Sequence, residues 1–165
     1  MSVNTLEKLL IDELKDLYSA EHQITKALPK IAKATTSEEL KAALQNHLRE
    51  TEGQIERLDK IGTILGKKLT GKTCDGLKGV LTEGASVLEE VEEGTVRDAG
   101  IISAAQRVEH YEMAGYGAVR EYAMLLGMND VAALLDETLK EEKAADQKLS
   151  KIAKSVNSEA IHVAA

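Results

Sequence analysis

Two glutamates, Glu109 and Glu112, interrupt an otherwise apolar stripe in the segment AAQRVEHYEMAGYGAV, residues 104–119. Steps of three and four residues place them on one face of an α-helix together with Tyr116 and Val119. A carboxylate is costly to bury unless it is protonated, paired or bound to a metal ion. Two of them one turn apart on a core-facing stripe therefore indicate a polar site inside the protein.

Similar interruptions occur in three other segments with helical spacing. Glu21 lies within a leucine stripe near the N-terminus, and Glu142 lies within a stripe that ends at Ile152. A third stripe carries His47, Thr51, Gln54 and Leu58, and Glu50 lies at its edge, one turn from both His47 and Gln54. Together these residues form the candidate metal-ligand set of the sequence: Glu21, His47, Glu50, Glu109, Glu112 and Glu142. Glu141 borders the same stripe as Glu142 and is its alternative.

The chemistry of this set favours metal binding. Carboxylates that share one interior repel one another by several kcal/mol per close pair, at an effective dielectric constant of about 20. They could take up protons, which requires raised pKa values, or two divalent cations could bridge them. Oxygen ligands with one or two imidazoles suit iron or manganese better than structural zinc. We therefore expect two metal ions, with iron as the first candidate and manganese as the second.

Four long helices must position these residues. The first is expected to begin near Asn4, with Glu7 as a capping-box partner, and Pro29 is expected to kink or end it. The second is expected to begin at Thr36, with Glu39 at capping-box spacing.

Thr95 and Asp98 offer a start for the third long helix, and the sequence LGMND ends it and caps the fourth. Residues 66–94 form a link that contains a shorter helix interrupted by glycines. After about Asn157 the chain looks frayed, so we expect one domain over residues 1–157 and a frayed tail over 158–165.

The lengths of the connections predict the topology. Short turns make the first two helices, and likewise the last two, antiparallel neighbours. Folding about residues 35–36 sets Glu21 opposite Glu50, and folding about residue 127 sets Glu112 opposite Glu142. The long link lets the second pair return along the first, which is an all-α, ferritin-like antiparallel four-helix bundle with one long crossover.

Composition excludes several other classes of protein. The chain has 165 residues, 43% of them apolar, with one proline and a formal net charge of −7. This charge, without a basic arm, argues against nucleic acid and anionic membranes as partners. Charges throughout the N-terminus exclude a signal peptide. Cys74, as a single cysteine, cannot form an intrachain disulfide, so we expect a cytoplasmic protein, with the periplasm as the alternative location.

Four segments resemble the YciF/YciE family of ferritin-like bacterial stress proteins: YSAEHQITKALPKIAKA, LKAALQNHLRETEGQIERLDKI, VRDAGIISAAQRVEHYEMAGYGAVREYAMLLG and LLDETLKEEKAADQKL. The resemblance covers nearly the whole chain. It implies a homodimer of four-helix bundles, each with a rubrerythrin-like metal site, and a role in stress. Carried over to this chain, the ligands would be Glu21, Glu50, Glu109 or Glu112, and Glu142.

The chain departs from the wider di-iron pattern, in which Glu-x-x-His occurs on two helices. Three residues after Glu50 and Glu142 stand Gly53 and Ala145, and neither has a ligating side chain. His47 is a candidate to compensate on the second helix. Asp146, or the second acid of the Glu109/Glu112 pair, is a candidate to fill the other gap, so we expect a site rich in carboxylate.

Two functions from different classes follow from this reading. One is a dinuclear metal protein that handles iron, dioxygen or peroxide during stress, with a possible oxidoreductase activity. The other is a structural or interaction bundle, whose acids hold one structural ion or none and whose protein partner is unknown. An iron-storage cage ranks lower because no fifth helix follows residue 157, and a hydrolase ranks lowest because no sugar-stacking aromatics accompany the acids.

Overall fold

The computed structural model describes residues 3–162, which contain five α-helices and no strand. The helices are α1 (Leu6–Ala34), α2 (Glu38–Leu65), α3 (Asp75–Glu90), α4 (Thr95–Leu125) and α5 (Asn129–Ala160). None of them combines the length and the apolar character that a membrane span requires.

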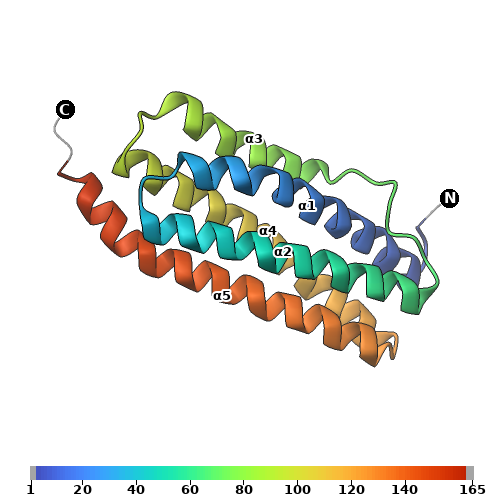
Figure 1. Ribbon diagram of the computed structural model, residues 1–165. Coiled ribbons are helices and arrows are strands. Elements are labelled where there is room, and N and C mark those ends of the chain that lie inside the picture. Colours follow the sequence, from blue (N-terminus) through green and yellow to red (C-terminus); the bar gives the residue numbers. More distant parts are fainter. Residues whose placement is uncertain (1–2, 163–165) are drawn as a thin grey trace.

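The four long helices form the antiparallel bundle that the sequence predicts. In Figure 1, α2 runs back along α1, and α5 runs back along α4. Between these hairpins, α3 carries the chain back over α1 and α4, so that α4 starts at the end of the bundle where α1 finishes. The crossover contains the shorter helix that was expected, and the predicted fold class is confirmed.

The stripes read from the sequence are the buried faces of the helices. On α2, for example, His47, Thr51, Gln54 and Leu58 are all buried. The buried apolar residues form two separate clusters. One cluster includes Ile24 and Leu44, and it occupies the half of the bundle near the α1–α2 turn; the other occupies the opposite half.

The expected helix starts are each shifted by about one residue. Thr5, and not Asn4, caps α1 by accepting a hydrogen bond from the backbone N–H of Lys8. Ser37, and not Thr36, caps α2 in the same way. The error arises because several neighbouring residues here can cap a helix, and spacing alone does not choose among them.

Pro29 does not end α1, which continues to Ala34. The side chain of Pro29 is exposed, whereas Leu28 and Ala32 on either side of it pack into the core. Tertiary packing of these neighbours therefore outweighs the loss of one backbone hydrogen bond.

The C-terminal helix also continues farther than expected, to Ala160 and not to about Asn157. Val156 is buried, which extends the packed face of α5 toward its end. Residues 163–165 of the expected frayed tail lie outside the described residues, and the domain boundary itself stays a prediction.

Asp98 does not cap its own helix, because α4 begins after Gly94 without a side-chain cap. Asp98 is fully buried and joins the two hairpins instead. Its carboxylate accepts hydrogen bonds from the backbone N–H groups of Thr36 and Ser37, at 3.1 and 2.7 Å, and from the Thr36 hydroxyl at 2.6 Å. The first turn of α4 thus fixes the turn between α1 and α2.

Gly115 allows α1 and α4 to approach closely. A Cβ atom at this position would lie 2.8 Å from a methyl carbon of Leu17. A side chain larger than hydrogen at this position would therefore force the two helices apart or displace Leu17. At Gly117 a Cβ would meet nothing within 4 Å.

We expect Asp98→Ala to lower the free energy of unfolding by about 2 kcal/mol, because it removes the acceptor of charge-assisted hydrogen bonds at a helix N-terminus. Urea unfolding followed by circular dichroism measures this loss. As a control, Asp75→Ala removes an exposed acid from the first turn of α3 and should cost less than about 1 kcal/mol. Equal losses in the two variants would contradict the role of Asp98.

Candidate metal centre

A layer of buried polar side chains separates the two apolar clusters of the core. Each of the four long helices contributes to it. The members of the layer are Glu21 from α1, His47, Thr51 and Gln54 from α2, Glu109 and Glu112 from α4, and Thr138 and Glu142 from α5. The hairpin turns therefore bring the interrupting residues to a common height, as the sequence predicts.

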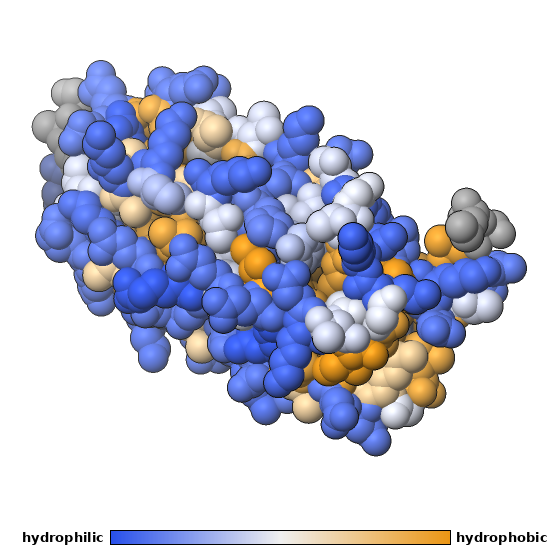
Figure 2. All heavy atoms as spheres, turned by 45° about the vertical axis from the view of Figure 1, so that its right-hand side comes forward, coloured by the Kyte–Doolittle hydropathy of each residue, from blue (hydrophilic) through white to orange (hydrophobic). Residues whose placement is uncertain are grey.

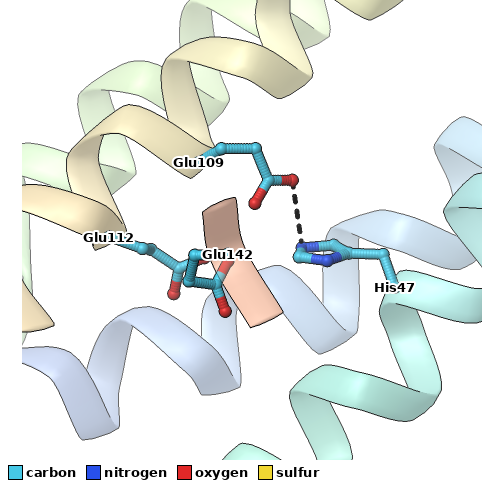
Figure 3. Close-up of side chains that lie close together, drawn as sticks. All are labelled: His47, Glu109, Glu112 and Glu142. Carbon is cyan, nitrogen blue, oxygen red and sulfur yellow. Dashed lines mark ion pairs between the residues drawn. The ribbon is translucent and has the colours of Figure 1, made fainter. Parts of the chain in front are cut away.

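Four of these residues gather around one point. His47, Glu109, Glu112 and Glu142 each offer a ligand atom, and these atoms all lie within 4.8 Å of one another. Figure 3 shows Glu109 and Glu112 extending from neighbouring turns of α4, with His47 facing Glu109. The closest approach between the ring and that carboxylate is 3.5 Å, from Nε2 of His47 to Oε1 of Glu109.

Glu21 borders this group from α1 and is fully buried. The Tyr116 hydroxyl donates a very short hydrogen bond to Oε1 of Glu21. The ring of Tyr116 is also completely buried, so this residue both packs in the core and bonds to a carboxylate of the layer.

The two neighbouring acids of α5 have different surroundings. Glu142 points into the layer and accepts a very short hydrogen bond from Nε2 of Gln54. Glu141 faces outward and pairs with Arg57, whose guanidinium donates at 2.8 and 3.0 Å. Glu142 is therefore the interior acid, and the alternative that exchanged the two is wrong.

Glu50 and Asp146 lie outside the four-residue group. Glu50 is half-buried, accepts a hydrogen bond from Asn46 at 2.7 Å and borders a cavity beside His47. Asp146 accepts a hydrogen bond from Gln106 at 2.9 Å and lies 3.4 Å from exposed His110. The structure does not bring either residue into the cluster, and ligation by Glu50 stays a prediction.

The layer contains many polar atoms without a hydrogen-bond partner. Among the described residues, such buried atoms include both ring nitrogens of His47, both carboxylate oxygens of Glu112, and one oxygen each of Glu21, Glu109 and Glu142. Buried polar groups are nearly always satisfied, so a concentration of unsatisfied ones needs an explanation. All of these atoms are of the types that coordinate iron or manganese, and the donor set therefore fits a metal ion.

Burial and mutual repulsion perturb the acids strongly when no cation is present. Desolvation is the largest cause that raises the pKa of each of Glu21, Glu109 and Glu112 well above its usual value, and repulsion by neighbouring carboxylates adds to it. Desolvation also raises the pKa of Glu142, to about 7, although hydrogen bonds from its neighbours oppose this rise. Burial lowers the pKa of His47 to about 4.

The charge of the layer also suits two cations. No lysine or arginine is among its buried members within residues 3–162. If Glu21, Glu109, Glu112 and Glu142 ionise, the layer holds four negative charges, which two divalent ions would neutralise. Such ions would replace the protons that the acids otherwise need.

The comparison with known proteins agrees with the fold. Residues 5–161 match the family described as Domain of unknown function (DUF892). The chain is 46% identical over 154 residues to Protein YciF of Escherichia coli strain K12, which covers 93% of each chain. The chain belongs to the YciF family.

Solved structures of relatives superpose closely on this bundle. The crystal structure of the E. coli stress protein YciF matches with a TM-score of 0.91 and 44% identity, over 94% of this chain and 99% of that one. YcfI of Rhodopseudomonas palustris, described as a putative structural protein, matches with a TM-score of 0.88 and 44% identity, over 90% and 95% of the two chains. A Xanthomonas campestris protein shares the fold, with a TM-score of 0.75 and 18% identity, over 95% and 96% of the two chains.

One member of the layer, Gln54, was assigned no role in the prediction from the sequence. Gln54 lies on the predicted buried stripe of α2, two turns from His47, and orients Glu142 through its amide. Its position on that stripe was the available signal, because a glutamine on a core-facing stripe needs a buried partner.

We expect the metal-free protein to become less stable as the pH rises from 6.5 to 8. The acids have raised pKa values in the folded state, so the folded chain binds more protons than the unfolded chain in this range. His47 offsets only a small part of this loss, because it is neutral in the folded state and loses at most half a proton in the unfolded state above pH 6.5.

One extra proton bound by the folded state over this interval corresponds to about 2 kcal/mol of lost stability. Denaturant unfolding of chelator-treated protein at the two pH values measures it. Glu112→Gln removes one of the titrating groups and should reduce the slope. A stability that rises between pH 6.5 and 8 in chelated wild-type protein would contradict the expectation.

Proposed function

We propose that the protein is a ferritin-like dinuclear metal carboxylate protein that handles iron, dioxygen or peroxide during stress. The observation that carries this proposal is the cluster of His47, Glu109, Glu112 and Glu142, which offers converging ligand-type atoms inside the bundle and includes at least one buried atom without a hydrogen-bond partner on each residue. The stress role is supported by the relationship to E. coli YciF, which is described as a stress protein.

In this proposal the four clustered residues and Glu21 hold the ions. Tyr116 orients Glu21, and Gln54 orients Glu142, so that their remaining oxygens face the other ligands. A bound iron or manganese pair would supply the Lewis acidity and the electrons that the side chains themselves lack. The surrounding apolar clusters exclude bulk water from the site.

The raised pKa values also give the residues a role in proton movement. A cation that binds must displace protons from Glu21, Glu109, Glu112 and Glu142, so metal affinity should rise with pH. Burial and nearby Glu21 raise the pKa of the Tyr116 hydroxyl. The hydroxyl therefore stays protonated and continues to donate its hydrogen bond to the Glu21 carboxylate.

The alternative is a structural bundle, which is favoured by the description of the R. palustris relative as a putative structural protein. In this alternative the layer holds one ion without redox turnover. Loading the chain with Fe(II) without oxygen and then adding dioxygen or peroxide separates the two. The dinuclear proposal expects iron oxidation faster than that of free Fe(II), whereas the alternative expects no acceleration.

We further propose a cytoplasmic homodimer. The absence of an intrachain disulfide suits a reducing compartment. Most of the face in Figure 2 is hydrophilic, but apolar side chains gather in patches toward its lower right. Met124 and Leu125, beside the α4–α5 turn, are among the exposed large apolar residues that a second copy could cover, and light scattering would measure the mass in solution.

We expect Glu112→Gln to reduce the metal content of the purified protein by at least about tenfold, because it removes a central ligand charge. Elemental analysis of protein prepared without chelators measures the content, which should be close to two ions per wild-type chain. The matched control is Glu121→Gln, an exposed glutamate on the same helix, which should retain its metal.

Metal should also stabilise the wild-type fold. At roughly a hundred times the dissociation constant, the added ion contributes about 2.7 kcal/mol, which calorimetry would record as a higher Tm. Wild-type protein that carries no metal, and whose Tm does not respond to iron or manganese, would contradict the proposal.

A further inference from the structure

A cavity that is partly open to solvent adjoins the polar layer on the side of the α1–α2 turn. It has a volume of about 210 Å³ and is lined by residues from all five helices. Most of the lining is apolar, with Ile24, Leu44 and Val108 among its walls. Because an apolar cavity of about 150 Å³ is enough to bind benzene, this one has room for a small organic molecule.

Many of the residues that line the cavity have small side chains. Small residues line it on all five helices, among them Ala27, Ala43, Gly84, Ala104 and Ala145. Larger apolar residues at these helical positions would fill the space without any change of fold class. The cavity therefore results from the small side chains at these positions and not from the fold class alone.

The crossover helix α3 forms one wall of the cavity. Val80, Leu81 and Gly84 line it, and each is only partly buried. Among the residues of α3, Leu77 is the one that is fully buried. The helix thus covers the space with a lightly packed face, and Figure 1 shows it lying across α1 and α4.

The polar residues of the cavity lie at the boundary with the metal centre and at its rim. His47 and Glu109 line the inner end; both are more than nine-tenths buried, and both have atoms without a hydrogen-bond partner. Asn46, Glu50 and Lys148 also line the cavity. A molecule inside would place its apolar body among the aliphatic side chains and could offer a polar group to His47 and Glu109.

We propose that this cavity is a binding site for a neutral, monocyclic molecule that carries one hydroxyl group, with the hydroxyl directed at Glu109 and His47. A hydroxyl both donates and accepts a hydrogen bond, which matches a carboxylate oxygen and an imidazole without partners. An anionic group is disfavoured, because the lining is mostly apolar and burial of a charge without a close partner is costly. The site goes beyond the proposed metal function, since its apolar walls do not depend on bound ions, whereas the contact with the hydroxyl requires Glu109 and His47 to be free of metal.

The test uses 4-fluorophenol as the probe and the full-length chain, both as purified and after chelation. Saturation-transfer fluorine NMR should detect binding at millimolar concentration in the chelated protein, and binding should be weaker in the preparation in which metal occupies Glu109 and His47. Methyl signals of Ile24, Leu44 and Val108 should shift in the chelated protein, whereas those of Leu135 and Val119, in the other apolar cluster, should not. Metal content is measured separately, so that a failure of the probe to bind can be distinguished from a failure of the proposed metal function.

Two variants fill the cavity, and one serves as a control. Ala43→Leu and Ala27→Leu add bulk at lining positions on α2 and α1, and either should weaken binding by about tenfold or more. Ala27→Leu is included in case Ala43→Leu does not fold. Ala27 is partly exposed, so its position tolerates the larger side chain. Ala114→Leu makes the same change at an exposed position of α4 and should bind the probe as wild type does.

The comparison of probes tests the polar end. Fluorobenzene, which lacks the hydroxyl, and 4-fluorobenzoate, which is charged, should both bind more weakly than 4-fluorophenol. Absence of binding, shifts confined to methyl groups outside the cavity, unchanged affinity in the folded filled variants, or tighter binding of the benzoate would each overturn the proposal.

Discussion

Mutual repulsion among buried carboxylates is the constraint on which the rest of this structure depends. Glu21, Glu109, Glu112 and Glu142 lie in one interior layer without a buried lysine or arginine among its members in the described chain. Charges of one sign in a medium of low polarity interact strongly, so these acids need protons or cations. The apolar clusters on either side then supply the stability that tolerates the layer, because burial of aliphatic side chains is the main favourable term in folding.

The fold was predictable from the sequence because helical periodicity and loop length determine a bundle of this kind. The stripe through His47, Thr51 and Gln54 was read correctly as a buried face, and the long link produced the expected crossover. Helix ends were less predictable, since capping residues cluster in sequence. Asp98 shows why: its partners, Thr36 and Ser37, are distant in the chain, and local spacing contains no information about them.

The candidate site was predictable to the level of helix faces. Four of the six proposed ligands converge, and Glu21 borders them, because each lies at the centre of its stripe. Glu50 lies at the edge of its stripe, and a rotation of the helix that spacing cannot resolve decides whether such a residue faces inward. Similarly, Glu141 and Glu142 are adjacent in sequence, and only the packing of α5 against α2, with Arg57 held by Glu141, distinguishes them.

The contribution of α2 to the layer differs in kind from that of the other three long helices. It presents an imidazole, a hydroxyl and an amide through His47, Thr51 and Gln54, whereas α1, α4 and α5 each present at least one carboxylate. Two ions in such a layer would have inequivalent surroundings, one nearer to nitrogen and one nearer to oxygen alone. Occupation would then proceed stepwise, with a half-filled form that has its own affinity and spectrum.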